Sequence, residues 1–88
     1  MRLKVQTIGN GLHPNEVVVQ VTTTSGTEQL VLDKRSLSKD SISVGAPVGR
    51  ANGKKLLVEL PREAMSGAWR VWVNKSQLVP ESDQVSAA

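Results

Sequence analysis

The sequence predicts an all-β protein, a small antiparallel barrel or strongly curled sheet of five to six short strands. Apolar residues recur with a period of two in short runs, turn-forming dipeptides separate these runs, and no stretch of about a dozen residues keeps a helical apolar stripe. The chain has 88 residues and no Cys, so a single domain must fold on its hydrophobic core without disulfides. We assign residues 1–79 to this domain and residues 80–88 to a disordered tail.

The first two strands are expected at residues 3–8 and 16–24. A turn built on Gly9-Asn10-Gly11 ends the first strand, because these residues readily reach positive φ. In the second strand Val17, Val19 and Val21 face one side, and Glu16, Val18, Gln20 and Thr22 face the other. The three valines of one parity are therefore core candidates.

A hairpin turn at Ser25-Gly26 connects the second strand to a third. A two-residue loop there places Val21 opposite Leu30 and Val19 opposite Leu32, so that apolar residues meet on one face. The same register makes Val18 and Val31 diagonal neighbours on the outer face.

Residues 33–43 are rich in Ser and in charged residues, and we expect an irregular connection anchored in the core by Leu37 and Ile42. A second hairpin is centred on Asn52-Gly53, a dipeptide favoured in tight turns. Pro47 makes its first arm, residues 44–51, an edge or bent strand. In its second arm Leu56, Val58 and Leu60 share the inward parity.

Residues 61–66 are expected to form about one helical turn, because Pro61 stands early in the segment and Gly67 follows it. A last long strand, residues 67–74, then carries both tryptophans. Trp69 has the parity of the neighbouring valines and is expected inside, where it would contribute roughly 4–6 kcal/mol as an upper bound. Trp72 has the parity of Arg70 and is expected on the outer face.

A tight turn that starts at Asn74 or at Ser76 should return Leu78 and Val79 to the core. The run from Trp72 to Leu78 (WVNKSQL), a strand followed by a short turn and a returning Leu, resembles the ending of many SH3-like barrels, including bacterial SH3 modules. The resemblance implies a fold and no ligand. The peptide-binding aromatics of eukaryotic SH3 domains have no counterparts, since the chain contains neither Tyr nor Phe.

The residues offer little for catalysis, so we expect a protein that is not an enzyme, with no catalytic residue, no metal and no cofactor. His13 is the only His, and without Cys a zinc site would have to rely on carboxylates. No Gly-x-Ser-x-Gly elbow and no phosphate-binding glycine loop are present. The N-terminal residues contain no continuous apolar stretch and no run has membrane-spanning length, so we expect a cytoplasmic protein that does not contact a membrane.

The charge pattern leaves nucleic acid as an alternative ligand. The formal net charge is +3, and residues 1–79 hold 11 basic and 6 acidic residues, which leaves +5. The candidate contacts to a phosphate backbone are Lys34, Arg35, Arg50, Lys54, Lys55 and Arg70.

The function that the sequence favours is an interaction module. Each well-patterned strand carries an apolar exception on its polar side, and together with an arginine these define the candidate contact residues Trp72, Arg70, Val18, Val31 and Leu57. We expect this outer face to bind a protein partner or a second copy of the chain.

Overall fold

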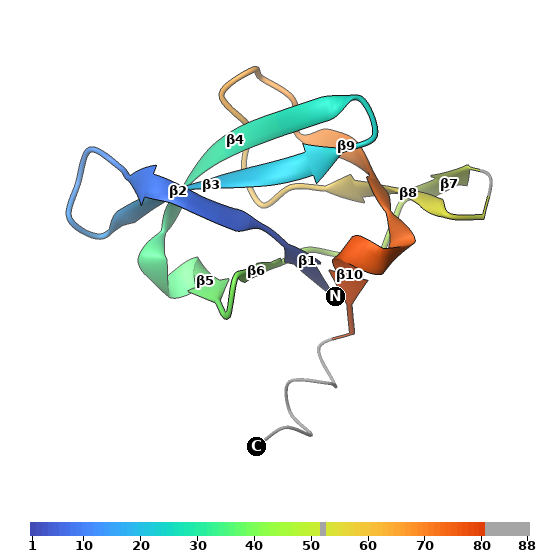
Figure 1. The fold of residues 1–88 in the computed structure, drawn as a ribbon, viewed down its shortest axis with the longest axis horizontal. Helices are drawn as coiled ribbons and strands as arrows, with labels where there is room; N and C mark the ends of the chain where they lie inside the picture. Colours follow the sequence, from blue (N-terminus) through green and yellow to red (C-terminus); the bar gives the residue numbers. More distant parts are fainter. Residues whose placement is uncertain (52, 81–88) are drawn as a thin grey trace.

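The computed structural model describes residues 1–51 and 53–80 and is all-β, as predicted (Figure 1). Ten short strands and two single-turn 3-10 helices make up these residues. The elements are β1 (Arg2–Lys4), β2 (Gln6–Asn10), β3 (Glu16–Thr23), β4 (Gly26–Asp33), η1 (Lys34–Ser36), β5 (Leu37–Ser38), β6 (Ser41–Ser43), β7 (Gly49–Ala51), β8 (Lys55–Glu59), β9 (Arg70–Asn74), η2 (Lys75–Gln77) and β10 (Leu78–Val79).

The strands form three antiparallel sheets that share one hydrophobic core. Their strand orders are β10-β1-β6-β5, β2-β3-β4 and β7-β8-β9, and among the described strands the sheets do not join into a closed barrel. The strand count exceeds the expected five to six because β5, β6 and β10 form in segments where no strand was expected, and because one expected strand is divided in two. Residues 3–8 show this: Val5 interrupts the strand and donates its backbone N–H to Asp40 O at 2.8 Å, so β1 and β2 belong to different sheets.

The β3-β4 hairpin has the predicted faces but a different register. Val17, Val19 and Val21 are buried as expected, whereas the residues between them are not. Val19 pairs with Leu30, not with Leu32, because the turn lies one residue earlier than Ser25-Gly26. The correction moves the pairing by two residues, and a shift of two keeps every side chain on its original face.

The Ser-rich segment is more ordered than expected, since residues 34–43 form η1 and the short β5-β6 hairpin. Ile42 is fully buried and Leu37 packs against the core, which confirms both anchors. Arg2 fastens the hairpin to β1: its Nε donates to Ser41 Oγ at 2.8 Å and its Nη2 to Ser41 O at 2.7 Å.

The second hairpin joins β7 and β8 through residues 52–54, so its turn is longer than a two-residue loop. Gly49 therefore lies opposite Leu57, the place that a two-residue loop would give to Val48. Asn52 lies outside the described residues, and Gly53 adopts a φ of 67°, which suits glycine. Burial of Leu56, Val58 and Leu60 confirms the predicted inward parity of the second arm.

The helical turn expected at residues 61–66 is not present. This segment runs as a loop along the open edge of β4. Met65 donates its backbone N–H to Gln29 O at 2.8 Å, and Arg62 Nη1 donates to Val31 O at 3.0 Å. Both bonds cover the edge of β4, and the Met65 bond uses a backbone N–H that a helical turn would have directed to a carbonyl within the segment.

Trp69 is not the core residue that its parity predicts, because 47% of its surface is exposed. The strand begins only at Arg70, one residue after the indole. At this end of the sheet the core positions belong to Leu60 and Ala64, each 6% exposed. A turn at Gly67, with a φ of 92°, leads the chain into β9 and leaves Trp69 outside.

The chain returns to the core as predicted after β9. The turn η2 directs Leu78, which is 8% exposed, into β10 beside β1. The tail expected at residues 80–88 lies outside the described residues from position 81 on. Within the described part of the chain, no helix has the length and apolar character needed to span a membrane.

Candidate binding surface

The outward-facing residues of the β7-β8-β9 sheet form the surface that we call the Trp72 face. The burial of β9 alternates, with Val71 and Val73 buried and Trp72 exposed between them. Cross-strand pairing then arranges the exposed side into rows. The rows are Gly49, Leu57 and Trp72 in the centre, Glu59 and Arg70 on one side, and Ala51, Lys55 and Asn74 on the other.

The indole of Trp72 lies across the sheet and does not project straight into solvent. A Cβ atom placed on Gly49 would sit 3.7 Å from Trp72 Cη2 and 3.3 Å from Leu57 Cβ. Since β8 separates β7 from β9, the ring must pass over Leu57 to reach that point. Trp72 keeps 37% of its surface exposed in this position. The central row is thus an apolar platform with one accessible aromatic ring.

Arg70 contacts two side chains, those of Trp69 and Glu59, at one end of the Trp72 face. Its guanidinium carbon lies 4.4 Å from the ring centroid of Trp69, and its Nε lies 3.3 Å from Glu59 Oε2. The stacked guanidinium keeps the exposed Trp69 beside this face. The ion pair neutralises Glu59, the one acidic side chain in the rows of the described face.

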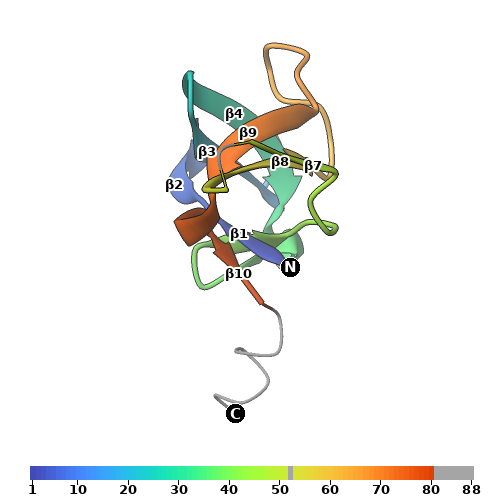
Figure 2. The ribbon, with the colours of Figure 1, turned by 90° about the vertical axis from the view of Figure 1, so that its right-hand side faces the viewer.

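Lysines border the other end of the Trp72 face. Lys75 donates its backbone N–H to Lys54 O at 2.8 Å, which brings the start of η2 against the β7-β8 hairpin. A cleft of ≈ 520 Å³ opens there, lined by Lys54, Asn74, Lys75 and Ser76. Asn74 belongs to the same strand face as Trp72, two residues along, so the cleft adjoins the aromatic platform. Figure 2 views the molecule from the side of this hairpin.

Two predicted contact residues, Val18 and Val31, lie on a different sheet. They pair directly across β3 and β4 and are half-buried. The β3-β4 hairpin reaches β9 where Thr24 donates its N–H to Trp72 O at 2.9 Å. Val18 lies six residues before Thr24, or about 20 Å along an extended strand. The structure therefore brings together Trp72, Arg70 and Leu57 and separates the two valines from them.

The six predicted basic contacts are also divided. Arg50, Lys54, Lys55 and Arg70 belong to the β7-β8-β9 sheet or its hairpin. Lys34 and Arg35 belong to η1, which directly precedes β5, and in Figure 1 β5 lies left of the centre while β7 lies at the right end. Arg35 is engaged locally, with its Nη2 3.2 Å from Asp33 Oδ2. Hydrogen bonds from Arg35 lower the pKa of Asp33 below its ordinary value.

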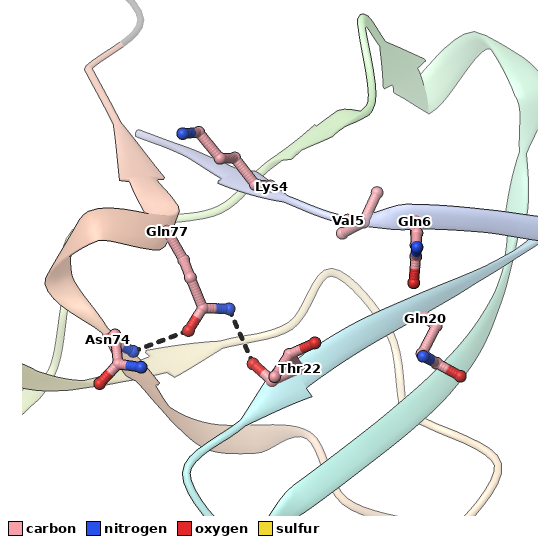
Figure 3. Close-up of a pocket in the computed structure, with 7 residues that line it drawn as sticks. All are labelled: Lys4, Val5, Gln6, Gln20, Thr22, Asn74 and Gln77. Carbon is pink, nitrogen blue, oxygen red and sulfur yellow. Dashed lines mark hydrogen bonds between the residues drawn. The ribbon is translucent and has the colours of Figure 1, made fainter.

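A separate polar cleft of ≈ 380 Å³ lies where β1, β3 and η2 meet, and Figure 3 shows the seven residues around it. Gln77 holds one wall, because its Nε2 donates to Thr22 O at 2.7 Å and its Oε1 accepts from Asn74 N at 2.9 Å. The amides of Gln6 and Gln20 come from opposed positions of β2 and β3, while the Lys4 amino group points away from them (Figure 3). The lining offers amides and one amine, and it lacks the carboxylates and imidazole used for acid and base catalysis.

His13 has a local role in the turn before β3. Its backbone N–H donates to Glu16 Oε1 at 3.2 Å, and its carbonyl accepts from Glu16 N at 3.0 Å. Within residues 1–51 and 53–80, no three acidic or imidazole side chains gather closely enough to hold a metal ion.

Sequence reasoning missed two parts of this surface, namely Trp69 and the cleft between Lys54 and Lys75. Gly67 before Trp69 was the available signal that the strand starts later. The two lysines are 21 positions apart in sequence, and only the fold brings them together. The chain matches no protein-family model, no curated protein and no solved structure, so the surface is interpreted from its geometry.

Proposed function

We propose that this protein is a non-enzymatic interaction module that binds a protein partner, or a second copy of the chain, through the Trp72 face. The observation that carries the proposal is the position of Trp72, which lies over Leu57 and next to Gly49 while more than a third of its surface stays open at 37%. Tryptophan and arginine are among the residue types that most often dominate binding energy at interfaces, and Arg70 lies two residues from Trp72 on the same strand face.

The rigidity of this surface supports the proposal. Trp72 is fixed by its neighbours on a three-stranded sheet, so less side-chain entropy is lost on binding than for a freely rotating ring. The loop of residues 61–69 bonds to the edge of β4, and Trp72 keeps 37% of its surface exposed. We further propose the small curled β domain as a scaffold akin to SH3-like barrels, on the basis of the WVNKSQL resemblance.

The test compares Trp72→Ala with a matched control, Val31→Ala, which removes a half-buried apolar side chain from the other sheet. Light scattering over a concentration series measures self-association, and affinity capture followed by mass spectrometry measures partners retained by the wild-type protein. We expect Trp72→Ala to abolish self-association or partner capture, and we expect Val31→Ala to leave it unchanged. Equal behaviour of the two variants in both assays would refute the Trp72 face as the binding surface.

Nucleic acid is a second candidate because Arg70 and Lys55 lie on the β7-β8-β9 sheet, Lys54 lies in the adjoining turn, and both Trp72 and Trp69, the residue before β9, are exposed. This mode requires binding to single-stranded oligonucleotides that weakens steeply as salt rises, since the contacts would release counterions from phosphates. Oligothymidylate titrated at low and high salt measures it.

A further inference from the structure

The charges around the Trp72 face are almost all positive. Lys55 lies in the row next to Trp72, and Lys54 and Lys75 line the adjoining cleft. Glu59 is paired with Arg70 at 3.3 Å and adds no free negative charge. A ligand that complements this surface therefore carries negative charge at the lysine end and an apolar group at the Trp72 end.

The spacing between the two ends matches an extended polypeptide. Trp72 and Asn74 are two residues apart on one strand face, which is about 7 Å, and Asn74 lines the lysine cleft. In an extended chain, side chains two residues apart also point the same way at about this distance. An apolar residue on the Trp72 ring would place the second residue after it at the mouth of the cleft.

The aromatic residues favour a polypeptide over a nucleic acid strand. Single-strand binding proteins stack successive bases on several open rings. Here the ring of Trp69 already carries the guanidinium of Arg70, at 4.4 Å from its centroid. Trp72 rests on the apolar side chain of Leu57, and this central row offers an apolar anchor site.

Building on the proposed function, we infer that the partner of the Trp72 face is an extended acidic protein segment. It places an apolar side chain on Trp72 and, two residues away, a carboxylate in the cleft between Lys54 and Lys75. The lysine ammonium groups and the apolar platform each contribute to the binding free energy. Binding therefore requires an apolar residue and an acidic residue that are two positions apart in the segment.

The test titrates the full chain with short synthetic peptides followed by NMR of the backbone amides and the two indole N–H groups. The matching peptide is Ser-Leu-Ser-Glu-Ser-Glu-Ser, in which Leu and both Glu share a face when extended. One control peptide replaces both Glu by Lys, and a second moves each Glu by one residue to the opposite face. We expect the Trp72 indole and the Lys54 and Lys75 amides to shift with the matching peptide, more weakly with the second control, and not with the first.

Variants locate the effect on the protein. Lys54→Glu and Lys75→Glu should each weaken the matching peptide by about two- to fivefold, as expected for exposed charge pairs, and the double variant should bind the lysine peptide instead. Lys34→Glu on η1 is the matched control and should bind as the wild-type protein does.

Absence of binding by the matching peptide, or equal binding of all three peptides, would overturn the inference. Oligothymidylate that shifts the same amides while the peptide does not would assign the surface to nucleic acid and also overturn it. If Trp72→Ala still abolishes self-association or partner capture in that case, the proposed function stands and only the acidic segment is wrong. If the matching peptide does not bind and Trp72→Ala also leaves self-association and partner capture unchanged, both the acidic segment and the proposed function are wrong.

Discussion

Trp72 and Gly49 stand at opposite ends of one cross-strand row, and the indole spans the strand between them. Leu57 pairs with both residues and lies under the ring. A Cβ on Gly49 would touch Trp72 Cη2 at 3.7 Å and press on Leu57 Cβ at 3.3 Å, so a side chain larger than that of alanine would extend into the space beside the ring. The flatness of the Trp72 face thus depends on a residue in a different strand.

Gly49→Val should displace the Trp72 ring without unfolding the protein, because added methyl groups would occupy the space next to Leu57. Tryptophan emission, recorded in a Trp69→Phe background so that only Trp72 reports, should move toward that of a solvated indole. Gly45→Val is the control, since a Cβ there meets nothing within 4 Å. An unchanged emission spectrum in the Gly49 variant would mean that the ring does not reach β7.

Trp69→Ala should have a small effect on folding, contrary to what strand parity predicts. The indole is 47% exposed and its contact with Arg70 is a surface cation-π interaction, so we expect a loss of about 1 kcal/mol in the free energy of unfolding. Leu60→Ala, at the core position of that end, should cost about 2–5 kcal/mol. Urea denaturation compares the two, and a larger loss for Trp69→Ala would place this ring in the core.

Ser66→Ala should loosen the loop of residues 61–69 from the edge of β4. Ser66 Oγ donates to Glu28 Oε1 at 2.6 Å and also accepts from Ala68 N at 3.3 Å. Without these bonds the amide of Met65, which donates to Gln29 O, should exchange with solvent faster. Hydrogen exchange followed by NMR checks this, with Ser76→Ala as a control. Unchanged protection at Met65 would show that the backbone bond alone holds the loop.

The ion pair of Asp33 and Arg35 should give a small pH dependence of stability. Hydrogen bonds from Arg35 hold the folded pKa of Asp33 below its unfolded value, so the contribution is complete above the unfolded pKa and disappears as pH falls through the lowered folded pKa. Arg35→Gln should raise the pKa of Asp33, and NMR titration of the carboxyl carbon measures it. The pair lies at the surface, so the effect on stability is small, and an unchanged pKa of Asp33 in Arg35→Gln is the contradicting result.

The sequence predicts which side of a strand is buried better than it predicts which residues pair across neighbouring strands. The alternation of Val17, Val19 and Val21 identifies the buried side of β3, because burial of one face constrains parity strongly. Parity does not distinguish registers two residues apart, and the β3-β4 pairing differs from the expected one by that amount. The order of strands along the chain also does not reveal that Val18 and Trp72 belong to different sheets.

Trp69 shows where local pattern reasoning ends. In a continuous strand, Trp69 would point to the same side as the buried Val71 and Val73, but the strand begins only at Arg70. Whether a strand extends by one more residue depends on what fills the core there, and Leu60 and Ala64 come from other segments. Of the candidate contact surface, Trp72, Leu57 and Arg70 could be predicted, while the lysine cleft depends on how η2 meets the β7-β8 hairpin.

The pairing of Leu3 with Leu78 joins two strands that the ribosome makes far apart in time. β1 is the second strand of its sheet, flanked by β6 and by β10, which is the last element of the described chain. Until residues 78 and 79 have been synthesised, β1 can pair with β6 along one edge while its other edge has no partner strand. β1 therefore gains its second partner strand only after β10 has been added, and variants that slow this pairing should aggregate during expression.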